Sequence, residues 1–462
     1  MDASSVFAKH FATTKFEDLP KEVVEATKIQ ILDYFGVAMC GSTKLGANEV
    51  RDLAIEMGGA EQATVFGAGV KLPVMNAAQC NATSAHTLDF DDVHEQAVMH
   101  PGVVSIPTTL AVGEYKGGMT GKEFITCVAL GGDMICRMGL ATRPGENIHK
   151  YGWHFTTLNG FMTAAAIASR IMGMPEEKIV SAIGIAYHQS CGNGQAVKDG
   201  VMTKRLGPGF AVRGGIQAAR LADMGVTGAI NTFEGVSGYY KVYHGNCWSR
   251  DILVGDLGKR WESTNISVKP YSCCRGVHPS IDCAIKIANE HNVKPEDIEK
   301  IIIAVGEGPT YLLCEPFEAK RTPRNLVDSQ FSIPWGVATA LAYGKVSLNN
   351  FSEEAIHDEK ILAVSSKIEM ELDKSLNSTG LEPARVTVIT KDGRTEVEYT
   401  ETATGSPDCP LSFEQCAAKF YDLRECAEKP LAKENADKIV ELVRNLEDLS
   451  DVKELISLLV WG

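Results

Sequence analysis

The sequence predicts a mainly α-helical protein that carries one α+β insert. Three observations support this prediction. The chain has 462 residues, more than one ordinary hydrophobic core accommodates, which indicates two domains. Apolar residues recur with the 3.6-residue period of helices along most of the chain. Runs rich in β-branched residues, by contrast, are concentrated between residues 265 and 400.

The helical pattern is clearest from Leu19 to about Gly41, where Pro20 and Glu22 mark the start and apolar residues follow at helical spacing. Glycine or proline residues separate the later helices from one another. Alanine-rich stretches such as 162–168 permit close helix packing. Further helices are expected at 46–58, 73–88, 102–116, 121–142, 156–172, 176–190 and 209–224.

Extended segments define the insert. The β-branched run 301–305 predicts a strand. The segment 386–399 alternates apolar and polar residues on both sides of Asp392-Gly393, which is the strongest short signal of a β-hairpin. Two helices are expected between these strands, at 279–289 and 332–344.

These patterns divide the chain into two domains. The helical pattern returns from 412 to 459, so the tail is expected to pack back onto the first domain. We therefore assign residues 1–265 and 401–462 to the helical domain, and residues 266–400 to the α+β insert.

Composition and charge exclude several classes of protein. Apolar residues make up 44% and charged residues 23% of the chain, as in soluble globular proteins. The net charge of −14 argues against general nucleic-acid binding, which needs a basic face. A local cationic pocket for a small anion can nevertheless exist on an acidic protein.

The sequence also predicts a cytoplasmic protein without membrane contacts. No uncharged apolar run reaches the roughly 18 residues that span a bilayer, and residues 1–14 lack the apolar core of a signal peptide. The thirteen cysteines include no C-x-x-C pair. They are therefore expected to be reduced thiols in the core.

The densest cluster of chemically active residues lies at 86–102, between two apolar segments. A loop held between buried helices is a common place for functional residues. One interpretation is a solvated cap, and a second is a divalent metal cluster formed by Asp89, Asp91 and Asp92 together with the histidines of the segment. The third, which we favour, is an acid–base site in which a carboxylate orients an imidazole. The histidines and aspartates of the cluster are His86, Asp89, Asp91, Asp92, His94 and His100.

Cationic residues at other positions predict an anion-binding pocket. Lys204 precedes Gly207-Pro208-Gly209 at the expected start of a helix, where a cation opposes the helix dipole and an anionic ligand would explain it. His154 lies just before another helix, whose free N–H groups favour an anion; a satisfied core histidine is the alternative. Lys269 and Arg275 precede a third helix, where carboxylate binding and a structural role are the alternatives. Together these residues suggest proton transfer next to the carboxylates of a small polyanion.

Motifs spread over the whole chain carry a family resemblance. They are Leu88-Asp89-Phe90-Asp91-Asp92, His100-Pro101-Gly102, Lys204, Lys269-Pro270-Tyr271-Ser272-Cys273-Cys274-Arg275-Gly276-Val277-His278-Pro279 and Gln330-Phe331-Ser332-Ile333-Pro334-Trp335. In these motifs the chain resembles the MmgE/PrpD family, whose members include 2-methylcitrate dehydratase, cis-aconitate decarboxylase and iminodisuccinate epimerase. The resemblance implies a large all-helical domain formed by both chain ends, an inserted smaller α+β lid domain, and a homodimer. It also implies catalysis without a metal or organic cofactor.

The resemblance further implies which residues form the site. Two positions differ from decarboxylases of the family: Val93 stands where they carry threonine, and Cys274 stands where animal decarboxylases carry histidine. These differences leave the substrate open. The expected catalytic residues are Asp89, His100, His154, Lys204 and Lys269, and the expected substrate-binding residues are Val93, Cys274, Arg275 and His278.

The favoured hypothesis is a cofactor-independent lyase that acts on a small di- or tricarboxylate. Lys204 and Lys269, helped by Arg275, would pair with its carboxylates. His100 and His154 would exchange protons at the adjacent carbon, and Asp89 would orient one imidazole. Loss of hydroxide gives a dehydratase and loss of carbon dioxide a decarboxylase.

Three alternatives remain. Reprotonation on the opposite face would make the protein an epimerase of an iminodisuccinate-like dicarboxylate. A non-catalytic carboxylate-binding dimer could share the same fold. A metal enzyme built on Asp91, Asp92 and His94 would lose its activity on chelation.

Overall fold

The computed structural model describes residues 1–142, 152–378, 383–426 and 430–460. The chain separates into two compact units, and each is described by itself. Unit 1 comprises residues 1–196, 202–268 and 412–462, and unit 2 comprises residues 197–201 and 269–411. The sequence placed the domain boundaries after residues 265 and 400, whereas the units change after residues 268 and 411.

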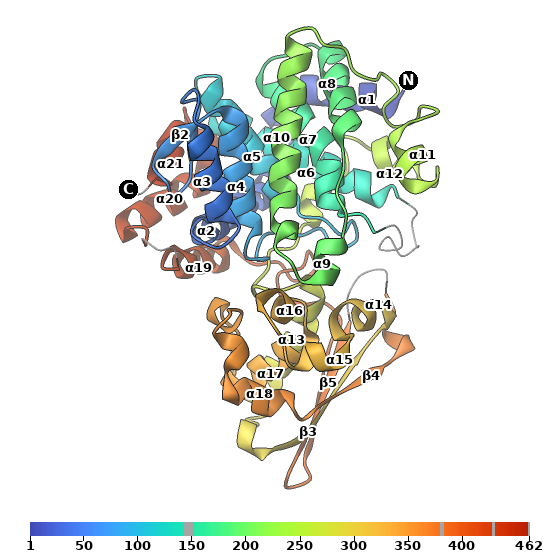
Figure 1. Ribbon diagram of the computed structural model, residues 1–462, viewed down its shortest axis with the longest axis vertical. Helices are drawn as coiled ribbons and strands as arrows, with labels where there is room; N and C mark the ends of the chain where they lie inside the picture. Colours follow the sequence, from blue (N-terminus) through green and yellow to red (C-terminus); the bar gives the residue numbers. More distant parts are fainter. Residues whose placement is uncertain (143–151, 379–382, 427–429, 461–462) are drawn as a thin grey trace. The chain divides into compact units, whose positions relative to one another are not determined.

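Unit 1 is mainly helical, as the sequence predicts (Figure 1). None of the helices in the described part of the chain combines the length and apolar character that crossing a bilayer needs. The helices of unit 1 are α1 (Ala3–Thr13), α2 (Lys21–Gly41), α3 (Ala47–Met57), α4 (Val74–His86), α5 (Gly102–Tyr115), α6 (Gly121–Leu140), α7 (Phe155–Ile171), α8 (Glu176–Gln189), α10 (Thr203–Asp223), α11 (Tyr239–His244), α12 (Arg250–Val254), α19 (Phe413–Arg424), α20 (Lys433–Arg444) and α21 (Lys453–Leu458), and the short α9 (Gln195–Asp199) spans the change between the units.

The sequence analysis expected an all-helical domain, but unit 1 also contains two short strands. The strands β1 (Ala63–Val65) and β2 (Val70–Leu72) form an antiparallel two-stranded sheet. Each strand has only three residues, which is too short to show the alternation by which strands are found in a sequence.

Small residues let the central helices of unit 1 approach closely. Helices α7 and α10 lie side by side (Figure 1). A Cβ atom added at Gly215 on α10 would lie 2.5 Å from the Cβ of Ala164 on α7, and one added at Gly160 would lie 2.9 Å from the Cβ of Ala211. Both distances are too short for real side chains, so glycine is required at these positions for the helices to meet.

Helix α10 begins earlier than predicted. The sequence placed its start at Gly209, but the helix runs from Thr203 and contains Pro208. The proline removes one intrahelical hydrogen bond, and the packing of α10 against α7 and α4 offsets that loss because helices in proteins are stabilised mainly by tertiary contacts. As a result, Lys204 lies in the first turn of the helix.

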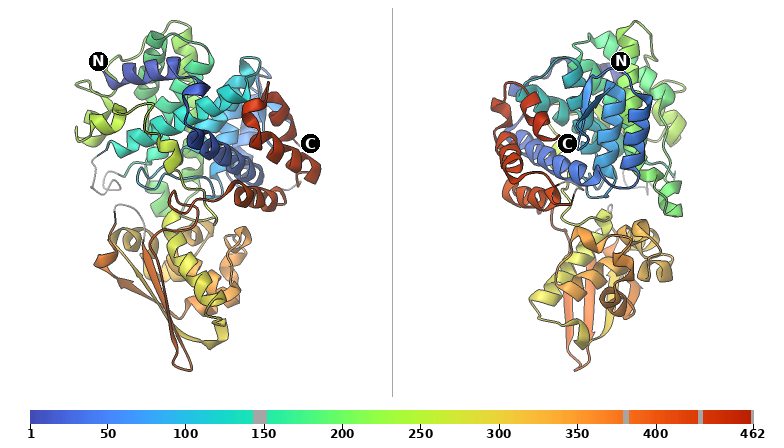
Figure 2. Two further views of the ribbon diagram at one scale, coloured as in Figure 1. Left: turned by 180° about the vertical axis from the view of Figure 1, so that it is seen from behind. Right: turned by 60° about the vertical axis from the view of Figure 1, so that its left-hand side comes forward.

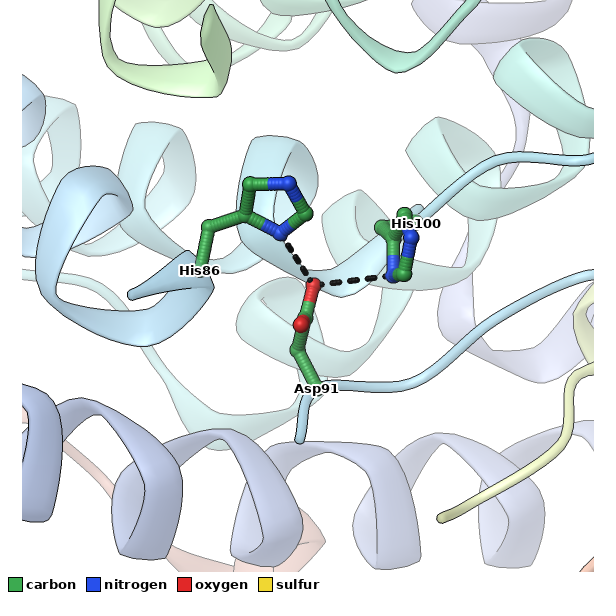
Figure 3. A group of neighbouring side chains, drawn as sticks. All are labelled: His86, Asp91 and His100. Atoms are coloured by element: carbon green, nitrogen blue, oxygen red, sulfur yellow. Dashed lines mark hydrogen bonds and ion pairs between the residues drawn. The ribbon is translucent and has the colours of Figure 1, made fainter. Parts of the chain in front are cut away.

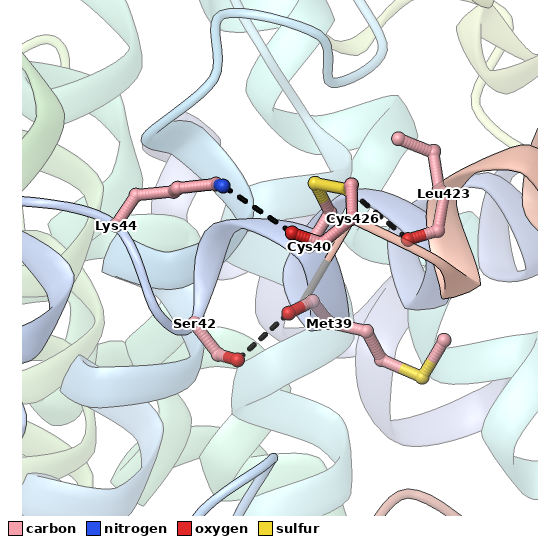
Figure 4. The surroundings of a disulfide bond; sticks show 6 residues. All are labelled: Met39, Cys40, Ser42, Lys44, Leu423 and Cys426. Atoms are coloured by element: carbon pink, nitrogen blue, oxygen red, sulfur yellow. Dashed lines mark hydrogen bonds between the residues drawn. A yellow bond between two sulfur atoms is a disulfide. The ribbon is translucent and has the colours of Figure 1, made fainter. Parts of the chain in front are cut away.

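The C-terminal helices of unit 1 pack beside α2, as the red and dark blue ribbons of Figure 2 show. A disulfide joins Cys40 at the end of α2 to Cys426 just after α19, although the two are 386 residues apart in the sequence (Figure 4). The Nζ of Lys44 donates a hydrogen bond of 3.2 Å to the carbonyl of Cys426. The prediction that the cysteines are reduced core thiols is therefore wrong for this pair, because only the packing of α19 on α2 brings them together. It also misses Cys191 and Cys409, which are exposed.

A buried arginine organises the segment that follows α12. Arg137 on α6 is fully buried and its Nε lies 2.7 Å from Oδ2 of Asp133. Its guanidinium also donates hydrogen bonds to the carbonyls of Ile252, Gly255 and Arg260, at 3.2, 2.8 and 2.5 Å. One side chain thus binds one carbonyl of α12 and two carbonyls of the irregular segment that follows it.

Unit 2 combines a four-stranded sheet with helices. The strand order is β4-β3-β5-β6, with β3 and β4 parallel and the other pairs antiparallel. Helix α13 packs on β5 and β6 (Figure 2). The elements are α13 (His278–Asn289), β3 (Ile298–Val305), α14 (Glu307–Pro309), α15 (Phe317–Arg321), α16 (Leu326–Gln330), α17 (Ile333–Tyr343), α18 (Glu359–Ser365), β4 (Ile368–Leu372), β5 (Ala384–Thr390) and β6 (Thr395–Thr400).

The strand and hairpin predicted in this region are confirmed. Strand β3 covers the run 301–305, and β5 and β6 form the hairpin, with Ile389 opposite Thr395 and Gly393 at a φ of 87° in the turn. Strand β4 was not predicted. Its glutamates alternate with apolar residues over only five positions, and its pairing partner β3 lies far away in the sequence.

His291 forms a pH-dependent contact in unit 2. Its Nδ1 lies 2.7 Å from Glu396 and its Nε2 lies 2.7 Å from Glu398, both on β6. Hydrogen bonds to Glu398 and Glu396 raise the pKa of His291 above its usual value of 6.5. Because this pKa is higher in the folded state than in the unfolded chain, protonation of His291 stabilises the fold. The stabilisation is complete at pH values below the pKa of the unfolded chain, and it is lost as the pH rises through the pKa of the folded state.

We therefore expect His291→Gln to destabilise the protein more at about pH 6 than at about pH 9. Chemical unfolding of the wild type and the variant over this pH range checks the prediction. A difference in unfolding free energy that is constant or that grows with pH would contradict it.

Candidate active site

The cluster identified in the sequence lies on the loop between α4 and α5, within unit 1. The loop is held by its own side chains. Both carboxylate oxygens of Asp92 accept hydrogen bonds from the N–H of Gly102, at 3.0 and 3.1 Å, and Nδ1 of His94 accepts from the N–H of Ala97 at 3.1 Å. Burial, followed by the charges of Asp91 and Asp33, raises the pKa of Asp92 well above its usual value. Asp92 and His94 therefore shape the loop.

One carboxylate oxygen lies between two imidazoles at the centre of the loop. Oδ2 of Asp91 is 2.8 Å from Nδ1 of His86 and 3.0 Å from Nδ1 of His100 (Figure 3). His86 is the last residue of α4, whereas Asp91 and His100 come from the loop. The side chains of His86 and Asp91 are buried, and that of His100 is 13% exposed.

The surroundings determine the charges of His86 and Asp91. Burial lowers the pKa of His86 to about 4, and the nearby charge of Asp91 only partly opposes this. Burial would raise the pKa of Asp91, but His100 and His86 together outweigh it and hold that pKa well below the usual range. At neutral pH Asp91 is therefore a carboxylate and His86 is a neutral imidazole that donates its Nδ1–H.

The contacts of His100 determine which of its ring nitrogens carries the hydrogen. Its Nδ1 lies 3.0 Å from Oδ2 of Asp91 and 2.8 Å from the carbonyl oxygen of Asp92. Both of these atoms can only accept at neutral pH, so Nδ1 must carry a hydrogen. The other nitrogen, Nε2, is thereby left as the atom at which His100 can gain or lose a proton.

A third histidine joins the cluster from the start of α7. His154 precedes α7 and its ring centroid is 5.9 Å from that of His86. Its Nδ1 lies 2.6 Å from Oγ1 of Thr157, and Oγ1 of the neighbouring Thr156 accepts a hydrogen bond of 3.0 Å from the N–H of His100. Burial, followed by the charges of His86 and Lys204, lowers the pKa of His154 well below 6.5. His154 is therefore neutral, beside a helix N-terminus that favours anions.

Lys204 supplies a positive charge beside these histidines. It lies in the first turn of α10 and forms an ion pair with Asp89. Asp89 adopts a positive φ of 51°, which asparagine and aspartate tolerate better than most residues. The charge of Lys204 contributes to the lowered pKa values of both His86 and His154.

The structure places four of the predicted catalytic residues in one unit. Asp89, His100, His154 and Lys204 all lie in unit 1. The sequence analysis expected Asp89 to orient an imidazole, and this role stays a prediction; the carboxylate that lies between His86 and His100 is that of Asp91. The sequence analysis listed neither His86 nor Asp91 as a catalytic or substrate-binding residue, because their pairing depends on how the loop folds back onto the end of α4.

Asp92 and His94, which the sequence analysis considered as metal ligands together with Asp91, make other contacts. Asp92 is engaged by Gly102, and Nε2 of His94 lies 3.3 Å from Glu262. Within the described part of the chain, the group of side chains that could hold a metal ion is instead His86, Asp91 and His100, whose ligand atoms lie within 4.8 Å of one another.

The other predicted residues have different surroundings. In unit 1, Val93 exchanges two backbone hydrogen bonds with Ser267, at 2.9 and 2.7 Å. In unit 2, Lys269 is buried, and Arg275 donates to the carbonyls of Ala403 and Thr404, each at 3.0 Å. His278 lies 3.1 Å from Arg275, and the N–H of Cys274 donates to the carbonyl of Gln330 at 2.8 Å. The role of these residues in substrate binding stays a prediction.

Comparison with known proteins gives matches along most of the chain. The MmgE/PrpD N-terminal domain matches residues 5–249, and the MmgE/PrpD C-terminal domain matches residues 271–448. The chain is 26% identical to the cis-aconitate decarboxylase-like protein oryM of Aspergillus oryzae, over 96% of this chain and 94% of that protein. It is 25% identical to the cis-aconitate decarboxylases of Aspergillus terreus and Homo sapiens, over 98% of this chain and 94% and 93% of those proteins.

Proposed function

Because the chain belongs to the MmgE/PrpD family, we propose that it is a lyase that acts on a small di- or tricarboxylate by proton transfer at a carbon next to a carboxylate. Its similarity to cis-aconitate decarboxylases extends over nearly their whole length. The observation that carries the proposal is the arrangement of Asp91 between His86 and His100, with His154 beside them. A buried carboxylate that holds one imidazole nitrogen leaves the other nitrogen oriented for general acid–base catalysis.

His100 and His154 exchange protons with the substrate in this proposal. In a decarboxylation, the bond to the departing carbon dioxide breaks, its electron pair stays on the substrate, and an imidazolium delivers a proton to that carbon. In a dehydration, a neutral imidazole takes the proton next to the carboxylate, and an imidazolium gives its proton to the hydroxide, which leaves as water. Burial lowers the pKa of His154, so its ring is neutral and is assigned the role of the base, and His100 is assigned the role of the acid, which donates from Nε2 when its ring is protonated.

Negative charge that develops on the substrate requires stabilisation. Lys204 is the cation beside the histidines, since its charge affects the pKa values of His86 and His154. A fixed cation in a site with little water contributes about 1.5–3 kcal/mol to the stability of an enolate-like state. Lys204 therefore binds a substrate carboxylate, with Asp89 holding the ammonium in position.

Lys204→Met is expected to lower kcat/KM by about 10- to 100-fold, the effect of losing one hydrogen bond between charged groups. Lys204→Arg, which keeps the charge, should recover part of the loss. Steady-state kinetics of both variants, with thermal unfolding to confirm that they fold, checks this. Equal activity of the methionine variant and the wild type would exclude Lys204 from the site.

The proposed reaction can be tested by NMR in deuterated buffer with a panel of di- and tricarboxylates. We expect one substrate to lose water or carbon dioxide and to take up deuterium at the carbon next to a carboxylate. Deuterium exchange without elimination would favour the epimerase instead. Thermal stabilisation by a carboxylate without any exchange or product would show a non-catalytic binder.

Other features carried by the family resemblance remain part of the proposal. They are catalysis without a metal or organic cofactor, a homodimer, a cytoplasmic location, and substrate contacts made by Val93, Lys269, Cys274, Arg275 and His278.

A further inference from the structure

We propose that His86, Asp91 and His100 form a reversible binding site for a divalent transition-metal ion of the zinc type, and that this ion inhibits proton transfer. In this proposal the ion is an inhibitor, and the reaction itself does not require it. The ion would lie between Oδ2 of Asp91 and the Nδ1 atoms of His86 and His100, and it would replace the two contacts drawn as dashed lines in Figure 3.

The ligand set suits such an ion. Two imidazoles and one carboxylate are ligands that zinc, cobalt and iron(II) accept in proteins. Zinc binds nitrogen and oxygen at about 2.0–2.1 Å, so tetrahedral ligand atoms are about 3.3 Å apart. Oδ2 of Asp91 now lies 2.8 and 3.0 Å from the two Nδ1 atoms. These two contacts would open by roughly half an ångström to admit the ion, and the two imidazole nitrogens, which lie within 4.8 Å of each other, would adjust to the same spacing.

One buried atom of the same group points to a ligand. Oδ1 of Asp91 is buried and has no hydrogen-bond partner in the described part of the chain. Buried polar atoms without partners are rare in proteins. Oδ1 of Asp91 gives the ion a second carboxylate oxygen without breaking any other contact.

The surroundings of His86 predict that the ion is held weakly and not permanently. A metal-bound histidine usually donates its second N–H to a carboxylate or a carbonyl. Nε2 of His86 has no such acceptor, so an ion on Nδ1 would leave a buried N–H unpaired. The positive charge of Lys204 also opposes the ion, although Asp89 compensates for it through their ion pair.

Binding would stop proton exchange at His100. An ion on Nδ1 takes that nitrogen's lone pair and moves the hydrogen of the neutral ring to Nε2. His100 can then no longer accept a proton at Nε2, and Asp91 no longer orients it. Inhibition thus rests on the proposed role of His100 in proton transfer, but it does not depend on the identity of the substrate.

Cobalt(II) is the probe for the experiment, because its visible spectrum reports ligand type and geometry. The purified wild-type protein, freed of metal by chelation, should bind one equivalent of cobalt per chain with the spectrum of nitrogen and oxygen ligands, and zinc should displace it. His100→Gln should weaken cobalt binding at least about 100-fold, since loss of outer-shell partners alone costs about 10–100-fold. The matched control is His291→Gln, which removes a histidine that also lies between carboxylates but in unit 2, and should bind cobalt as the wild type does.

A second measurement avoids variants altogether. In wild-type protein with ¹⁵N-labelled histidine, zinc should shift the imidazole nitrogens of His86 and His100 and leave most of the eleven histidines unchanged. Unchanged cobalt binding in His100→Gln, a spectrum with thiolate ligands, or zinc shifts confined to other histidines would each overturn the proposal. Because these readouts measure binding, a failed metal site and a failed lyase assignment would be told apart.

Discussion

Replacement of His100 by glutamine is expected to lower turnover by about 10²–10⁴-fold, the usual contribution of general acid–base catalysis. Glutamine can still form a hydrogen bond near Oδ2 of Asp91, so the loop should keep its conformation while the proton-exchanging Nε2 is lost. Substrate binding should change little, because the contribution of His100 is made in the transition state. Steady-state kinetics on the substrate found by NMR gives kcat and KM separately.

The control for this variant is His291→Gln, which replaces a histidine outside the cluster and should retain wild-type turnover. The pH dependence adds a second criterion. If His100 is the acid, the variant should also lose one limb of the pH–rate profile. Turnover within a factor of about two of the wild type would remove His100 from the mechanism.

Replacement of Arg137 by methionine is expected to cost about 3–5 kcal/mol of unfolding free energy, as for other buried ion pairs that lose one partner. The variant leaves the carboxylate of Asp133 buried without its cation, and it leaves the carbonyls of Ile252, Gly255 and Arg260 without their donor. The segment after α12 should therefore loosen first. Chemical unfolding gives the free energy, and hydrogen exchange shows which segment opens.

An exposed pair provides the comparison. Arg444 and Glu414 lie 3.0 Å apart with side chains 47% and 71% exposed, so Arg444→Met should cost no more than about 1 kcal/mol. The cost of Arg137→Met should also fall at acidic pH. Burial raises the pKa of Asp133 to about 6 although Arg137 opposes this, and a carboxyl that takes up a proton no longer needs the cation. A loss below about 1 kcal/mol at neutral pH would contradict the role given to Arg137.

Local patterns in the sequence were sufficient for most elements of the fold. The helical pattern of 121–142 corresponds to α6 (Gly121–Leu140), and the alternation around Asp392-Gly393 corresponds to β5 and β6. Such patterns depend on neighbours within a few residues, so they can be read without knowing the fold. Strand β4 was not predicted because its alternation is short. The start of α10 was predicted too far along the chain because a sequence such as Gly207-Pro208-Gly209 usually interrupts a helix.

In the candidate site, too, local composition was readable from the sequence but the pairing of side chains was not. The sequence identified the segment 86–102 and the residues His100, His154 and Lys204, because unusual concentrations of imidazole, carboxylate and cation are visible in a linear chain. It assigned the orienting carboxylate to Asp89. Which of several neighbouring aspartates faces an imidazole depends on the path of the loop, and the left-handed backbone at Asp89 turns that residue toward Lys204.

By itself, the sequence determined the mainly helical fold, the hairpin, the family, and the segment where the chemistry is concentrated. Only the tertiary structure decided that Asp91 joins His86 to His100 and that Cys40 meets Cys426. The physical reason is the range of the interactions. Helical and strand periodicity are fixed by contacts between near neighbours, whereas partners of buried charges and thiols are chosen by the packing of elements that are distant in the chain.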